Sequence, residues 1–111
     1  MLIDREKAFR ELDMPEDLFN ELLDMFIEQT EPAMNFLREV SADTDYEAIR
    51  KSAHLLNGSA GNLRIEAVQS MAKKVELAAS QKQDMASIKS DIEKLSAIFE
   101  EVKKEITHGG A

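Results

Sequence analysis

One histidine of this chain lies inside a helical pattern, among unusually small residues. His54 belongs to the run Ser52-Ala53-His54-Leu55-Leu56-Asn57-Gly58-Ser59-Ala60-Gly61-Asn62-Leu63, whereas the other histidine, His108, is at the C-terminal end. An imidazole is largely neutral near pH 7, and the neutral ring is a nucleophile. A solvent-facing His54 can therefore form a covalent intermediate through a ring nitrogen without a strong base.

The helical phase places His54 away from the core. At 100° per residue one stripe faces inward: Tyr46, Ile49, Ala53, Leu56, Ala60 and Leu63. Gly58 and Gly61 follow His54 at helical spacing on the outer face, although glycine inside a helix costs about 1 kcal/mol relative to alanine. We interpret both glycines as clearance for a docking partner, with close helix packing as the alternative. Leu55 is also off the core centre, and we expect it to contact that partner.

Several polar side chains near His54 are suited to binding an anion. Arg50 and Lys51 precede it by about one helical turn, and Lys73 belongs to the next predicted helix. Each could offset the charge of a bound anion, although a solvated surface side chain is the simpler explanation for any one of them. Asn57 can donate a hydrogen bond but brings no charge.

Two segments resemble the histidine-containing phosphotransfer (HPt) domain family. The run from His54 to Leu63 is similar to the family pattern His-x-Leu-Lys-Gly-Ser-[Ser/Ala]-x-Asn-[Leu/Ile], and Met71-Ala72-Lys73-Lys74-Val75-Glu76 looks like its second segment, Leu-Ala-x-x-Leu-Glu. With the flanking helices, the resemblance covers nearly the whole chain. One departure is Asn57, because the family usually has lysine three residues after the histidine.

The resemblance implies that His54 is a phosphoacceptor. In the chemotaxis-kinase branch of the family, a glutamate at the position of Glu76 accepts a hydrogen bond from the ring nitrogen nearer the backbone. Glu76 is therefore the candidate for orienting the imidazole, with an ordinary surface glutamate as the alternative. If the family lysine mainly stabilises phosphate electrostatically, Asn57 should weaken transfer or phosphate retention; if its role is mainly polar contact, Asn57 suffices.

The amino-acid composition argues against several other classes of function. The 111 residues carry 22 acidic and 14 basic side chains, a formal net charge of −8, which argues against general nucleic-acid binding. The chain has no cysteine, no histidine pair at metal-binding spacing and no glycine-rich phosphate loop with a lysine. We expect no metal and no cofactor of its own. Without a signal-like or membrane-spanning apolar run, we expect a cytoplasmic protein with no membrane contact.

Hydrophobic periodicity predicts only helices. We expect a short helix over residues 2–12, then longer helices over 15–40, 45–61, 64–81 and 85–106. Asp43 or Thr44 is the expected N-cap of the third. The predicted core stripe of the second helix consists of Leu18, Leu22, Phe26, Ala33, Phe36, Leu37 and Val40. Leu23, Ile27 and Met34 widen this stripe on one flank, where they are either packed by the N-terminal helix or form an apolar rim for a partner. The fold class is all-α, an antiparallel four-helix bundle with a short additional N-terminal helix, forming one domain over 1–108 with a frayed tail at 109–111.

The sequence therefore predicts a phosphocarrier rather than an enzyme. His54 would exchange a phosphoryl group with the aspartate of a response-regulator receiver domain, or accept it from a histidine kinase. Mg²⁺ is expected only on the receiver, and a monomer is the default. Two alternatives stay open: a phosphorylation-independent module that docks or sequesters receivers, which Asn57 favours, and a structural bundle with an incidental histidine.

Overall fold

Five helices make up most of the computed structural model, which describes residues 1–108. They are α1 (Arg5–Leu12), α2 (Glu16–Arg38), α3 (Tyr46–Asn62), α4 (Glu66–Ser80) and α5 (Met85–His108). The described residues contain no strand, which confirms the all-α prediction for this part of the chain. The predicted frayed tail, 109–111, lies outside the described residues. No helix within 1–108 combines the length and apolar character needed to cross a membrane.

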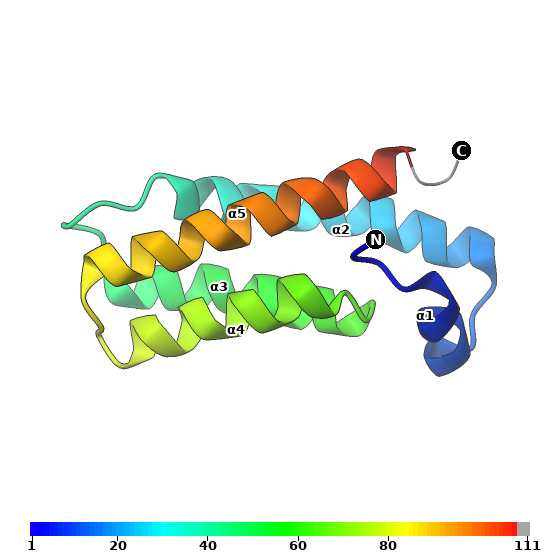
Figure 1. Ribbon diagram of the computed structural model, residues 1–111, viewed down its shortest axis with the longest axis horizontal. Coiled ribbons are helices and arrows are strands. Elements are labelled where there is room, and N and C mark those ends of the chain that lie inside the picture. The colour runs from blue at the N-terminus through cyan, green and yellow to red at the C-terminus, as the bar shows by residue number, and fades with distance from the viewer. Residues whose placement is uncertain (109–111) are drawn as a thin grey trace.

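The four longer helices lie along the long axis of a molecule measuring 44 × 23 × 20 Å, and successive ones reverse direction (Figure 1). α2 packs against α3 and α5, and α4 packs against the same two helices. The most extensive of these contacts joins α3 to α4. The short α1 lies across the end where α2 begins and where α3 turns into α4 (Figure 1). This arrangement leaves each long helix with one outward face.

The N-terminal segment is held by polar contacts at both of its ends. Residues 2–4 are not helical, contrary to the predicted start at residue 2, because Asp4 is the N-cap and its side chain accepts from the backbone N–H of Lys7 at 3.0 Å. The backbone N–H groups of Leu2 and Ile3 instead donate to the carboxylate of Glu105 on α5, at 2.8 and 3.0 Å. The extended residues thus tie the chain start to the last helix.

The start of α3 differs from the prediction by one residue. Its N-cap is Asp45, whose side chain accepts from the backbone N–H of Glu47 at 3.2 Å, so the expectation of Asp43 or Thr44 is wrong. The hydroxyl of Thr44 is used within the preceding turn, where it accepts from the backbone N–H of Ser41 at 2.8 Å.

The core face of α2 is rotated relative to the prediction. Leu18 and Phe36 were expected in the core but are 43 % and 40 % exposed. Leu23 and Met34 are fully buried, so the idea that they form a rim for a partner is wrong. The inward face consists of Phe19, Leu23, Phe26, Thr30, Ala33, Met34 and Leu37. Apolar residues occupy a wider arc of α2 than its neighbours cover, so periodicity alone does not select the buried part of that arc.

The core faces of the other three long helices have regular helical spacing. The expected residues of α3 and its C-terminal turn, from Ile49 to Leu63, are buried, whereas Tyr46 is only partly buried. The buried residues of α4 also recur at helical spacing: Val68, Ala72, Val75, Ala78 and Ala79. In α5 the buried apolar residues are Ile88, Ile92, Leu95, Phe99 and Val102. The outward faces of α3 and α4 consequently have the phase that the sequence predicts, which fixes where His54 points.

Candidate functional site

The turn between α3 and α4 aligns the two helices that carry the site. Arg64 adopts a left-handed conformation with φ of 60°, and the backbone N–H of Ile65 donates to the carbonyl of Ala60 at 2.9 Å. The guanidinium of Arg64 donates to the carbonyl of Gly61 at 2.9 Å and to Glu11 of α1 at 2.8 Å. Because His54 and Glu76 lie at similar chain distances on either side of this tight turn, they are level with each other on adjacent helices.

His54 and Glu76 are in direct contact. Nδ1 of His54 lies 2.9 Å from Oε2 of Glu76, and the side chains are 66 % and 18 % exposed, respectively. A carboxylate can only accept, so in this contact Nδ1 carries the hydrogen and Nε2 is left with its lone pair. The arrangement holds the ring by the nitrogen nearer the backbone while the histidine remains open to solvent.

Asn57 binds the same carboxylate. Its Nδ2 donates to Oε1 of Glu76 at 3.2 Å, so each oxygen of Glu76 has one N–H partner from α3. Asn57 was predicted to contact phosphate or a partner, but its amide is directed at Glu76. The sequence did not predict this pairing, because helical phase gives the direction of Asn57 around α3 but not the residue of α4 that it meets.

The two glycines have different surroundings. A Cβ added to Gly58 would meet no atom within 4 Å, so this position leaves open space beside His54. A Cβ added to Gly61 would lie 2.8 Å from Nε2 of Gln69 on α4. The side chain of Gln69 thus takes the space that a Cβ of Gly61 would fill, which favours the alternative of close packing over clearance for a partner at this position.

The basic residues near His54 differ in whether they are already engaged in ion pairs. Arg50 forms a bidentate pair with Glu47, with N–O distances of 2.9 and 2.6 Å, and this bond holds the pKa of the Glu47 carboxyl below its usual value. Lys51 and Lys73 are exposed, and none of the ion pairs within residues 1–108 involves either of them. The pairing of Glu47 with Arg50 was not predicted, although their i, i+3 spacing is a helical pairing signal.

Three exposed apolar side chains lie on one side of α2, and a fourth lies on α3. Leu18, Met25 and Phe36 are spaced by seven and eleven residues on α2, which places them on one side of that helix, and they are 40–45 % exposed. Met25 lines a cavity together with Ser59 and Asn62 of α3. Leu55, one helical turn before Ser59, is 45 % exposed. The predicted contact residue Leu55 is thus exposed on α3, the helix against which α2 packs.

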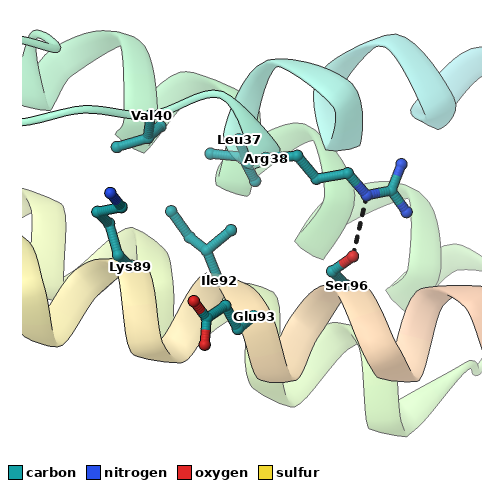
Figure 2. Close-up of a pocket in the computed structure, with 7 residues that line it drawn as sticks. All are labelled: Leu37, Arg38, Val40, Lys89, Ile92, Glu93 and Ser96. Atoms are coloured by element: carbon teal, nitrogen blue, oxygen red, sulfur yellow. Dashed lines mark hydrogen bonds between the residues drawn. The ribbon is translucent and has the colours of Figure 1, made fainter.

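Two cavities at the surface of residues 1–108 are small. The one beside Met25 has a volume of about 200 Å³, and the one between the C-terminal end of α2 and α5 about 190 Å³, below the roughly 300–1,000 Å³ of small-molecule pockets. Figure 2 shows the second, with Arg38 donating to Ser96 at its edge. It contains none of the predicted site residues. Within residues 1–108 no group of three His, Asp or Glu side chains is placed to hold a metal ion.

Comparison with known proteins identifies the family. The Hpt domain family matches residues 21–105, a range that includes His54, Asn57 and Glu76. No curated protein and no solved structure matches the chain. The match spans most of the sequence and all four long helices that position the exposed histidine, and the chain therefore belongs to the Hpt domain family.

Proposed function

We propose that this chain is a phosphocarrier of a two-component phosphorelay, with His54 as the phosphoacceptor. Membership of the Hpt family supports a role in histidine phosphotransfer. His54 receives the phosphoryl group from a receiver aspartate or from the catalytic domain of a histidine kinase, and passes it to a receiver aspartate. The working compartment is the cytoplasm, and the helices form an antiparallel four-helix bundle with α1 as an additional short helix.

One observation carries this proposal: an exposed imidazole whose Nδ1 is bound to Glu76, 2.9 Å away, next to a glycine with open space above it. This geometry leaves Nε2 as the free nucleophile. It also gives an incoming phosphoryl group room beside Gly58. Phosphoryl transfer depends mostly on positioning and charge stabilisation, so a carrier needs little more than a correctly presented ring.

The transfer of the phosphoryl group to His54 needs no external base. The Nε2 lone pair attacks phosphorus as the bond from phosphorus to the aspartyl oxygen breaks, and the electron pair leaves with the receiver carboxylate. The phosphorylated ring keeps the proton on Nδ1 and carries a positive charge, which the Glu76 carboxylate stabilises. In the reverse direction the ring leaves as neutral imidazole. Both directions use the same contact, as a carrier requires.

The partner surface in this proposal extends from α3 onto α2. The exposed stripe of Leu18, Met25 and Phe36, with Leu55 on α3, supplies apolar contact area beside His54. The exposed Lys51 and Lys73 are available to attract the acidic phosphoryl site of the receiver. Mg²⁺ enters on the receiver, and this chain provides the ring, its orientation and the docking face.

Intact mass spectrometry tests the proposal directly. The chain is mixed with a phosphorylated receiver, and wild type is compared with His54→Gln. We expect wild type alone to gain the mass of one phosphoryl group, and acid to remove it. Binding without any such gain, with several receivers and with a kinase donor, would instead support a module that sequesters receivers. No gain and no binding would leave only a structural bundle.

A further inference from the structure

We propose that Asn57 is a positioning residue that acts on His54 through Glu76, and not a ligand of the phosphoryl group. The inference concerns the same site and, for its effect on transfer, rests on the function proposed above. It starts from the observation that both oxygens of Glu76 are bound from α3: Oε2 by His54 at 2.9 Å and Oε1 by Asn57 at 3.2 Å.

The two contacts together fix the plane of the carboxylate. A glutamate bound through one oxygen can still rotate about its last side-chain torsion, which has a broad and shallow energy profile. A second donor on the other oxygen removes that freedom. Both donors come from α3, where Asn57 follows His54 by three residues, so the ring and the amide bind the carboxylate from the same helix face.

Burial makes Asn57 the more constrained of the two donors. Its side chain is half-buried, and Glu76 is 18 % exposed, whereas His54 is 66 % exposed. Solvent competes less for the amide–carboxylate bond than for the ring contact. The bond from Asn57 therefore adds a restraint on Glu76 that is less exposed to solvent than the ring contact.

The same geometry separates Asn57 from the phosphoryl position. Its amide donor is directed at Glu76, which lies on the Nδ1 side of the ring, whereas the phosphoryl group attaches to Nε2 on the other side. Because the amide is neutral, it fixes Glu76 without cancelling its charge. A lysine at this position would compete with the ring for the carboxylate. With Asn57 there, the full negative charge of Glu76 is available to the phosphorylated ring.

Ring ¹⁵N chemical shifts of the neutral imidazole measure this role without any phosphate donor. We expect the wild-type ring of His54 to carry its proton on Nδ1. Asn57→Leu removes the donor with little change in shape and should give a mixture of the two tautomers. Asn57→Gln, which keeps an amide donor, should restore at least half of the wild-type preference. His108 is the internal reference, and Asn35→Leu, which removes an exposed amide bound to Arg38, is the matched control.

Transfer kinetics complete the test. Asn57→Leu should lower the maximal transfer rate from a phosphorylated receiver three- to tenfold while the half-saturating receiver concentration changes less than twofold. Thermal unfolding of each variant shows that it is folded. Unchanged ring shifts in folded Asn57→Leu would overturn the inference, as would a purely binding defect. A shifted tautomer in a chain whose wild type accepts no phosphate would instead refute the proposed function and leave the positioning role intact.

Discussion

Removing the Glu76 carboxylate should slow phosphotransfer without unfolding the protein. Glu76→Ala eliminates the partner of Nδ1 of His54 and also releases the amide of Asn57. The ring is then free to rotate and to place its proton on either nitrogen. A ring protonated on Nε2 has no lone pair there for attack on phosphorus, so only part of the population is competent at any moment.

The exposure of the ring sets the size of the effect. Hydrogen bonds to charged groups contribute about 1.5–3 kcal/mol in protected surroundings. The His54 side chain is 66 % exposed, so water replaces much of this contact, and we take a value just below that range, about 1.4 kcal/mol. If the contact is lost in the transition state, that energy corresponds to roughly a tenfold lower rate. Stability should change by less than about 1 kcal/mol, because alanine favours helix and Glu76 fills no core position.

Rapid-quench measurement with an excess of phosphorylated receiver gives the transfer rate directly. Glu100→Ala is the matched control, since Glu100 is an exposed glutamate of α5 that pairs at 3.5 Å with Arg38, away from the site. We expect the control to transfer like wild type. A folded Glu76→Ala variant that transfers within twofold of wild type would refute the reasoning, because the ring would then be oriented by something other than Glu76.

Two further changes test the space and the charge around the histidine. Gly58→Glu should fold normally, since an added Cβ there meets no atom within 4 Å, but it should lower the transfer rate at least tenfold because bulk and negative charge oppose the incoming phosphoryl group. The control is Gly61→Ala, whose Cβ would meet only the movable end of Gln69. Equal transfer rates for both variants would place the partner on another face. Glu47→Gln should release Arg50 from its bidentate pair, and the freed guanidinium should lengthen the lifetime of the phosphohistidine two- to threefold. The loss of the phosphoryl mass over time measures this lifetime. An unchanged lifetime would show that Arg50 does not reach the phosphate.

The sequence by itself determined the helices and the outward direction of His54. Regular apolar spacing is a local property, so the core faces of α3, α4 and α5 and the outward direction of His54 follow from helical phase alone. The small residues after the histidine and the second segment ending at Glu76 were sufficient to suggest the family that matches residues 21–105. The helix ends were less well defined because caps such as Asp45 compete with nearby polar residues.

The tertiary structure decided which of several possible contacts each side chain makes. The apolar arc of α2 is wider than its neighbours cover, and only their placement leaves Leu18 and Phe36 at the surface. Gly61 faces Gln69 and Asn57 binds Glu76 because the turn at Arg64 sets the register of α4 against α3. Helical phase gives the direction of a side chain around its own axis, but the partner it meets depends on the distance and register of a second helix, which local periodicity does not encode.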